Sequence, residues 1–396
     1  MVYLHVPFCR SFCTYCDFYS EIACRDRDAQ LFGAFTDAVC EEISRRWDEI
    51  EATRSLNTLY IGGGTPSVLP PMYLCRILSS FAGDSPFTEF TIEVNPEDIV
   101  EKGPDFVREL LGLGVNRVSM GVQSLDDGIL RWMNRRHDAA HARQAFRILR
   151  DTGVGNISVD LIFGLPQLSE ATLARTLEEI AAWRPEHVSA YQLSIEDGSA
   201  LGRLVREGRF TEAPQEQCAA QYALLCRQLR EAGYEHYEIS NWALPGYEAV
   251  HNSAYWSRHP YVGLGPAAHS FHDRVRSWNG HSIPRSSELP PETSGYAGPH
   301  PSDDGPLPLT TPRVARFPGA VAACAGGSET LSTEEEREEE IMLGLRTARG
   351  VPEGLLDAEK AAEMLSDGRL VRLPDGRLRI PEDHWFVSDD IVSDLL

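Results

Sequence analysis

The sequence predicts an α/β protein in which strand–helix units repeat through the first half of the chain. Short runs rich in β-branched and aromatic residues alternate with segments in which apolar residues recur every three or four positions. Glycine or polar residues follow most of the short runs. At 396 residues the chain is long for one core, so we expect a large domain and a smaller one.

Five strands are predicted in this part of the chain, at Thr58–Ile61, Phe90–Val94, Arg117–Gly121, Ile157–Phe163 and Val188–Ile195. Helices are predicted between them, at Ala38–Ile50, Asp105–Leu113, Ala139–Leu149 and Ala171–Trp183. A helix that follows a parallel strand must pack back on the sheet, so repeated units form either a doubly wound sheet or a barrel. Both arrangements collect functional residues at the carboxyl ends of the strands.

Four polar or glycine-rich segments end predicted strands and should therefore meet at one edge. They are Gly62–Pro66, Glu93–Pro96, Gln123-Ser124 and Gly164–Pro166. Glycines in such a place let a ligand approach the backbone and expose N–H donors, although a glycine triplet by itself is more often a tight turn.

The rest of the chain divides by composition. We expect a partial barrel in residues 1–240 and a segment rich in aromatic residues and histidine in residues 241–281. Residues 282–328 hold nine of the 25 prolines and show little periodicity, which indicates a flexible loop or linker. Residues 329–396 begin with an acidic helix start at Thr333 and should form a small α-rich domain.

The composition excludes several classes of partner. A net charge of −22 opposes unaided binding to nucleic acid or to an anionic membrane surface, because both need clustered lysine and arginine. The chain shows neither the features of a signal peptide nor an apolar run long enough for a transmembrane segment, so we expect a cytoplasmic protein. The composition does not decide whether the protein forms a homodimer.

The strongest motif lies near the start of the chain, where Cys9, Cys13 and Cys16 have the spacing C-x3-C-x2-C. Three thiolates from one loop can hold an iron–sulfur cube of four irons and leave one iron open to another molecule. A zinc site is the alternative, but His5 precedes the cysteines by too little to complete it. The other alternative is that this cysteine spacing arose by chance. The nearby aromatic side chains argue against chance, because they would shield a cluster from solvent; they are Phe8, Phe12, Tyr15 and Phe18.

With its cysteine loop ahead of a strand–helix array, the chain resembles the radical S-adenosylmethionine (SAM) superfamily. The segments His5–Cys9, Asp17-Phe18, Ile61–Pro66 and Ser119–Ser124 resemble its oxygen-independent coproporphyrinogen dehydrogenase (HemN) group, and particularly the heme chaperone branch of that group. The resemblance implies an incomplete (β/α)6 barrel, a 4Fe–4S cluster on the three cysteines, and SAM bound to the open iron.

The same resemblance implies a set of SAM contacts by matched position. These are Tyr3, Gly63, Gly64, Thr65, Glu93, Gln123, Arg135 and Asp160. Carboxylates can accept hydrogen bonds from an ammonium group or from ribose hydroxyls, and arginine can pair with a carboxylate. For any single residue of the set, a solvated or ion-paired loop position remains the alternative.

Two functions compete under this resemblance. One is an enzyme that uses a SAM-derived radical to decarboxylate a porphyrinogen oxidatively; the other is a chaperone that binds heme and passes it to acceptor proteins. The enzyme branch carries a fourth cysteine two residues after the third, where this chain has Phe18, and it carries an extension ahead of the cluster. Both differences favour the chaperone and leave the catalytic residues unknown.

His251-Asn252-Ser253-Ala254-Tyr255-Trp256 matches the H-N-x-x-Y-W motif associated with heme binding in the chaperone branch. Imidazole is a common ligand of heme iron, and the two aromatic residues can offer flat surface to a porphyrin. The resemblance therefore implies that His251 contacts heme, while the residues alone favour an ordinary loop histidine. A radical SAM methyltransferase is a third function that the cysteine motif allows and the His251 motif disfavours.

Overall fold

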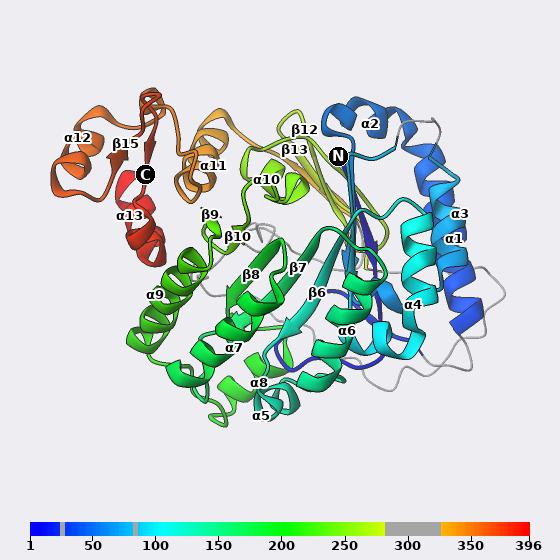
Figure 1. Cartoon of the computed structure of the whole chain (residues 1–396). Helices are drawn as coiled ribbons and strands as arrows, with labels where there is room; N and C mark the ends of the chain where they lie inside the picture. Colours follow the sequence, from blue (N-terminus) through cyan, green and yellow to red (C-terminus); the bar gives the residue numbers. More distant parts are fainter. Residues whose placement is uncertain (24–27, 82–85, 282–325) are drawn as a thin grey trace.

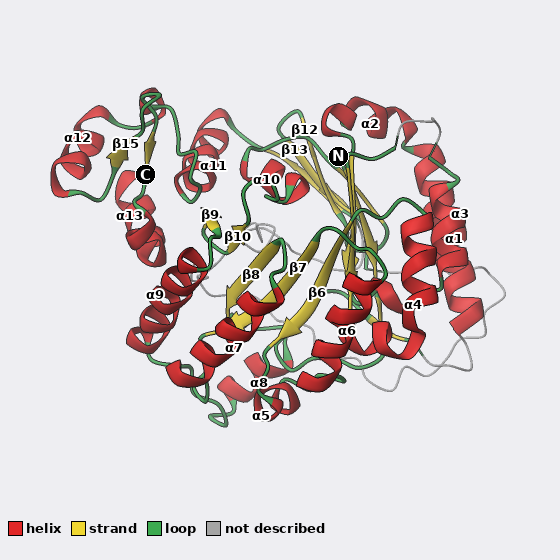
Figure 2. Cartoon of the chain, viewed as in Figure 1, coloured by secondary structure: helices red, strands yellow, loops and turns green. Residues whose placement is uncertain are grey.

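The computed structural model describes residues 1–23, 28–81, 86–281 and 326–396. Its centre is a nine-stranded sheet in the order β11-β1-β4-β5-β6-β7-β8-β10-β9 (Figures 1 and 2). The strands are β1 (Val2–Val6), β4 (Thr58–Gly63), β5 (Glu89–Val94), β6 (Arg117–Gln123), β7 (Ile157–Phe163), β8 (His187–Gln192), β9 (Glu235–Glu238), β10 (Asn241–Ala243) and β11 (Val262–Leu264).

Six strands, β1 and β4 to β8, run parallel and form the body of an incomplete barrel. β11 extends one edge in parallel with β1, and β10 and β9 extend the other edge as antiparallel strands. Both faces of the body are covered, so a strand such as β7 is apolar along most of its length and only Asp160 in it is not fully buried. β9 and β11 are the outer strands, and the sheet stays open between them.

Helices follow the parallel strands and cover the outer face of the sheet (Figure 2). Several start at a side chain that caps the first turn, as Asp138 and Ser169 do for α6 and α7. The helices before the C-terminal region are α1 (Asp28–Arg45), α2 (Trp47–Ala52), α3 (Pro71–Leu78), α4 (Pro96–Gly112), α5 (Asp127–Trp132), α6 (Ala139–Asp151), α7 (Glu170–Trp183), α8 (Ala200–Arg206), α9 (Gln215–Glu231) and α10 (Val250–Trp256), with 3-10 turns η1 (Arg54–Leu56) and η2 (Pro66–Val68).

The five predicted strands are confirmed, with small shifts at their ends, and the helix predictions need two corrections. The helix predicted at Ala38–Ile50 is two helices that break at Arg46, whose guanidinium reaches the Gly263 carbonyl at 2.8 Å. The helix predicted at Asp105–Leu113 is the second half of α4, which kinks where Gly103 takes a φ of 71° before Pro104.

The predicted segment 241–281 contributes to the barrel instead of lying beside it, because β10 and β11 belong to the central sheet. It also forms β12 (His269–His272) and β13 (Val275–Trp278), which pair with each other, and β13 pairs in addition with β14 (Gly327–Thr330). β14 begins inside the loop predicted at 282–328, and the remaining part of that loop, residues 282–325, lies outside the described residues.

The C-terminal region is a small unit that packs against α9 (Figure 1). A capping box between Ser332 and Glu335 starts α11. Glu339 in that helix pairs with Arg258 and Arg276, which join it to α10 and β13. The unit comprises α11 (Thr333–Leu345), η3 (Glu353–Leu355), α12 (Ala358–Asp367), β15 (Val371–Arg372), β16 (Leu378–Arg379), η4 (Glu382–Val387) and α13 (Ser388–Leu395).

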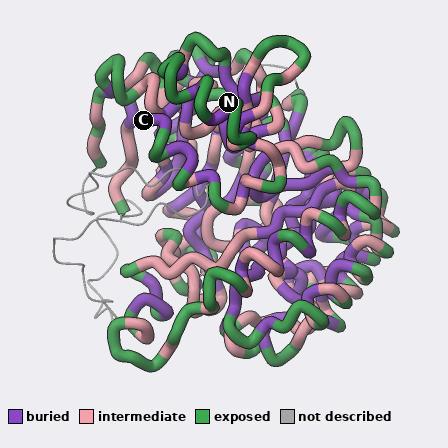
Figure 3. Tube along the Cα trace, turned by 90° about the vertical axis from the view of Figure 1, so that its left-hand side faces the viewer, coloured by how far each residue is buried: buried purple, intermediate pink, exposed green. Residues whose placement is uncertain are grey.

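Figure 3 shows buried residues gathered in the interior of the chain trace, with exposed segments at the periphery. One continuous apolar cluster includes side chains from the sheet, from the helices on it and from the C-terminal unit. Within the described ranges, no helix combines the length and the apolar character that crossing a bilayer requires.

Candidate cofactor site at the carboxyl edge of the sheet

The cysteine loop leaves the sheet directly after β1. Cys9 ends the short strand β2 (Phe8–Cys9), which pairs with β3 (Glu21–Ile22), so the loop returns to its starting point. The Thr14 amide donates to the Met133 carbonyl at 3.1 Å, which fixes the middle of the loop to the end of α5. Cys9 is buried, Cys13 and Cys16 are half-buried, and all three are free thiols.

The electrostatics of the loop suit a group that carries positive charge. Burial, followed by the neighbouring Cys13 thiol, raises the pKa of Cys16 to about 12, and burial also raises the pKa of Cys9. Deprotonating Cys9 and Cys16 therefore needs compensation by iron, and three thiolates are a donor set that fits a cluster.

The predicted aromatic shield of the loop is only partly present. Phe8 is fully buried, but it packs on Phe32 and Phe35, with ring centroids 4.8 Å and 5.2 Å away, in the core under α1. Phe12 and Phe18 are 53% and 54% exposed, so each turns about half of its surface to solvent. The loop thus presents two large apolar side chains to the outside.

The glycines after β4 bring its end against the cysteine loop. A Cβ atom on Gly63 would lie 2.7 Å from the His5 ring, and one on Gly64 would lie 2.9 Å from the Phe8 carbonyl oxygen. The Gly64 and Thr65 amides donate to the carbonyls of Val6 and Phe8, each at 2.8 Å. The expectation of free N–H donors at Gly64 and Thr65 is therefore wrong, because these amides already bind β1 and β2.

Glu93, near the end of β5, is the centre of the polar contacts at this edge. Its carboxylate accepts hydrogen bonds from the Tyr60 hydroxyl at 2.8 Å and from the Gly63 amide at 3.2 Å. Burial raises its pKa to about 7, and Asp160 adds to the rise. Tyr3 lies beside this pair, with its ring stacked on Tyr60 at 6.1 Å and its hydroxyl 3.1 Å from Nδ1 of His5.

Arg135 connects the cysteine loop to the end of β6. One guanidinium nitrogen lies 3.4 Å from the Cys13 sulfur and the other donates to the Gly121 carbonyl at 2.8 Å. Gln123 has a φ of 65° and stands where the pairing of β6 with β7 shifts register, a bulge that turns its side chain toward Gly121 and Arg135. Cys13, Gln123 and Arg135 therefore come together as predicted.

Asp160 lies deeper, at the middle of β7 and opposite Gly121 in the register. Hydroxyls of Ser119 and Ser158 donate to its carboxylate at 2.9 Å and 3.2 Å. Burial raises its pKa, while these hydrogen bonds act in the opposite direction. Asp160 thus faces the barrel interior next to Glu93 and not the rim itself.

His251 occupies a different place from the other predicted residues. It lies in α10, fully buried, with Nδ1 2.8 Å from the Thr58 hydroxyl and Nε2 3.0 Å from the Tyr255 hydroxyl. Burial lowers its pKa to about 3, so the ring is neutral. Thr58 begins β4 and Gly63 ends it, about 17 Å further along, so His251 lies at the end of the sheet opposite to the cysteine loop.

The chain is similar to known proteins along its whole length. The sequence profile of the radical SAM superfamily matches residues 3–180. A heme chaperone HemW from Mycobacterium tuberculosis is 32% identical over 100% of this chain and 94% of its own length. The chain belongs to the HemW family. A HemW from Bacillus subtilis is 31% identical over 88% of this chain and 84% of its own length.

The HemW chain shares its fold with a radical SAM enzyme. The structure of coproporphyrinogen III oxidase (HemN) from Escherichia coli superimposes with a TM-score of 0.73 and covers 99% of this chain and 89% of its own. The two sequences are 18% identical, so the likeness is one of fold. It confirms the incomplete barrel and the C-terminal helical region.

One residue of the candidate site, Tyr60, was not predicted from the sequence. Tyr60 bonds to Glu93, stacks on Tyr3, and has its ring 5.3 Å from that of His251, so it joins the cofactor edge to the opposite end of β4. The alternation of side chains along β4 could have indicated Tyr60. It places Thr58, Tyr60 and Gly62 on the inner face of the barrel, where the hydroxyl of a tyrosine is an unusual polar group.

Proposed function

We propose that the protein is a heme chaperone that binds heme, a 4Fe–4S cluster and SAM, and that it passes heme to acceptor proteins. The observation that carries this proposal is the similarity to HemW relatives over the whole chain, at 32% identity with the Mycobacterium tuberculosis protein. It extends beyond the barrel that all radical SAM proteins share and includes α10 and the C-terminal unit.

Cys9, Cys13 and Cys16 would hold the cluster through three of its irons. When bound, such a cluster supplies a reducing electron and an open iron for the amino acid part of SAM. Glu93 would accept hydrogen bonds from SAM, because its carboxylate lies beside the glycine-rich end of β4. Arg135 and Gln123 would position the ligand next to Cys13, and Tyr3 and Asp160 would contact it from the barrel interior.

The heme contact proposed for His251 requires a local opening. Its Nε2 atom must lose the hydrogen bond to Tyr255 before it can reach iron. α10 has only seven residues, and the carboxylate of Glu89 binds the amides of Val250 and His251 at its start. The start of α10 is thereby fixed, so the opening has to come from the Tyr255 side chain, whose ring must leave its contact with Tyr261 at 4.7 Å.

The cellular compartment is inferred from the chemistry of the thiols. Cysteines that stay reduced and a cluster that needs three thiolates both call for a reducing compartment, so we infer that the protein works in the cytoplasm. Cell fractionation checks this inference.

A porphyrinogen dehydrogenase is the alternative function, because the HemN enzyme has the same fold. Its fourth cysteine corresponds to Phe18, a side chain that the cysteine loop points outward and that cannot bind metal. We therefore infer that heme transfer, and not decarboxylation, is the activity of this chain.

One preparation tests both functions. The cluster is reconstituted without oxygen, heme uptake is followed by optical titration, and porphyrinogen decarboxylation is measured with SAM and a reductant present. Stoichiometric heme uptake and transfer to apoprotein, without a decarboxylated product, is the expected result. Rapid decarboxylation would refute the chaperone proposal and make the chain a dehydrogenase without the fourth cysteine.

A further inference from the structure

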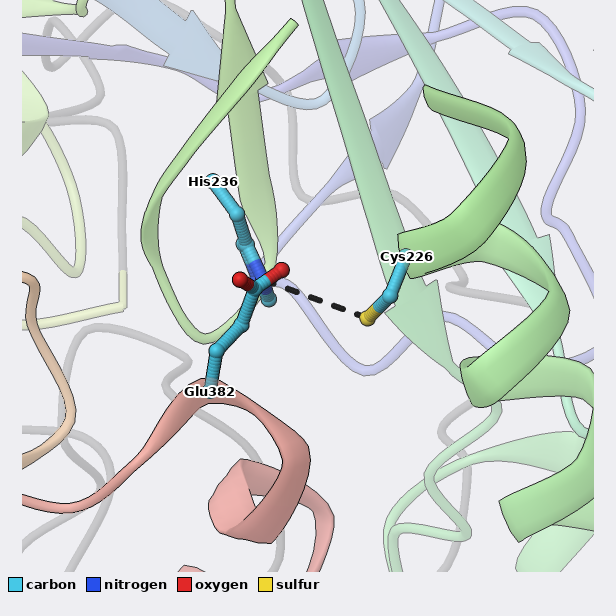
Figure 4. Close-up of side chains that lie close together, drawn as sticks. All are labelled: Cys226, His236 and Glu382. Atoms are coloured by element: carbon cyan, nitrogen blue, oxygen red, sulfur yellow. Dashed lines mark hydrogen bonds and ion pairs between the residues drawn. The ribbon is translucent and has the colours of Figure 1, made fainter. Parts of the chain in front are cut away.

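Three side chains that can bind metal converge at the junction between the barrel and the C-terminal unit (Figure 4). Cys226 comes from α9, His236 from β9 and Glu382 from η4. Their ligand atoms all lie within 4.8 Å of one another. No other group of three such residues in the described ranges has this spacing. The spacing of Cys226, His236 and Glu382 along the chain gives no indication that they meet.

The spacing is close to that of a tetrahedral metal site. Nδ1 of His236 lies 3.1 Å from Oε1 of Glu382 and 3.9 Å from the sulfur of Cys226. Zinc binds nitrogen and oxygen at about 2.1 Å and sulfur at about 2.3 Å, so tetrahedral angles place these ligand pairs about 3.4 Å and about 3.6 Å apart. Each distance thus differs from the ideal by a few tenths of an ångström.

The site is held in shape by residues that do not belong to it. The His236 ring stacks on Trp242, with centroids 4.1 Å apart and planes at 12°, and meets the edge of Trp385 at 4.4 Å. Arg230 binds the second carboxylate oxygen of Glu382 at 2.7 Å and leaves Oε1 directed at His236. Ligands fixed by packing and by outer hydrogen bonds lose little freedom when a metal binds.

We propose that Cys226, His236 and Glu382 bind one divalent cation of the zinc type, with water as the fourth ligand. Thiolate, imidazole and carboxylate together are a donor set that zinc accepts. The cation would join η4 of the C-terminal unit to α9 and to β9, the outer strand of the sheet. This site is separate from the cysteine loop, which follows β1 near the other edge, and it is independent of the heme chaperone proposal.

Zinc content of the full-length, cluster-loaded protein tests the site, because the cluster occupies the loop cysteines. After exposure to zinc and dialysis into metal-free buffer, we expect about one zinc per chain by elemental analysis. Cys226→Ser should lose this zinc. Cys218→Ser should keep it, because Cys218 is a buried thiol in the same helix but outside the group.

Glu382→Gln guards against a result caused by misfolding. The amide oxygen of glutamine can still accept the hydrogen bond from His236, so the junction should persist while the charge that attracts the cation is lost. We expect this variant to keep its cluster and to bind zinc at least about tenfold more weakly. Zinc should also raise the melting temperature of the parent and not that of Cys226→Ser.

X-ray absorption at the zinc edge locates the ion. The proposal requires one sulfur per zinc at about 2.3 Å, with the remaining ligands nitrogen or oxygen. Three sulfurs per zinc would place the metal on the cysteine loop and overturn the proposal. Equal zinc retention by the parent and Cys226→Ser, or no retention by either, would overturn it as well.

Discussion

Replacing Tyr255 with phenylalanine tests whether His251 is the residue that binds heme iron. The Tyr255 hydroxyl is 3.0 Å from Nε2 of His251, and this contact must break before Nε2 can reach iron. Phenylalanine keeps the flat ring but removes the contact in advance. A buried hydrogen bond contributes about 1 kcal/mol net, so the variant should bind heme about fivefold more tightly. Its unfolding free energy should fall by a similar amount, about 1 kcal/mol.

Optical titration with heme measures the affinity and urea unfolding measures the stability. Tyr261→Phe is the matched control, because its ring lies 4.7 Å from that of Tyr255 and its hydroxyl is not among the hydrogen-bond partners of His251 in the described part of the chain. An affinity that stays equal in both variants, or that drops in Tyr255→Phe, would refute the assignment of His251 as the ligand.

The pH dependence of heme binding gives a second check on His251. Burial lowers its pKa to about 3, so the ring is already deprotonated in the free protein at every pH above about 4. Protonation of His251 should therefore not weaken heme binding between pH 8 and pH 5. A tenfold or larger loss centred near pH 6.5 would point instead to an exposed histidine with an ordinary pKa.

Three further predictions concern the cluster, the barrel interior and the segment 282–325. Cys16→Ala should abolish the visible absorption of a reconstituted cluster, whereas Cys40→Ala, a thiol outside the loop, should leave it unchanged. Burial raises the pKa of Glu238 to about 8. Between about pH 4.5 and pH 8 the folded state therefore keeps a proton on Glu238 that the unfolded state has lost. The free energy of unfolding should fall as the pH rises through this range. Glu238→Gln should remove this fall, by up to about 1.4 kcal/mol per pH unit in urea unfolding. Replacing residues 282–325 by a short Gly-Ser linker should preserve SAM binding in equilibrium dialysis. It should not lower the free energy of unfolding, because Trp278 and Gly327 pair in the sheet and a shorter chain between them costs less closure entropy.

The parallel part of the fold could be predicted because its signals are local. A buried parallel strand such as Ile157–Phe163 is apolar along its length, and capped amphipathic helices such as α7 follow at short distance. β10 and β11 could not be predicted, since three-residue strands carry too little pattern. Their place in the sheet depends on partners far away in the chain, as in the pairing of Val262 with Val2.

The residues of the candidate site were taken from the resemblance and not from the residue pattern alone. Matched positions led to Glu93 and Arg135, and both lie beside the cysteine loop or the glycines that support it. The sequence could not show that the amides of Gly64 and Thr65 are occupied by backbone partners, nor that His251 is buried with both nitrogens bonded. These are facts of three-dimensional packing, and sequence spacing does not determine them.

The position of β1 between β4 and β11 has a consequence for protein synthesis. Val2 pairs with Val262, which follows it by 260 residues, and Gly265 sits against the backbone of His5. A ribosome that adds about 5 to 20 residues per second needs about 13 to 50 s to make that stretch. Until then β1, which leads into the cysteine loop, has one open edge. For most of translation, the three thiols of the cysteine loop therefore follow a strand whose second neighbour does not yet exist.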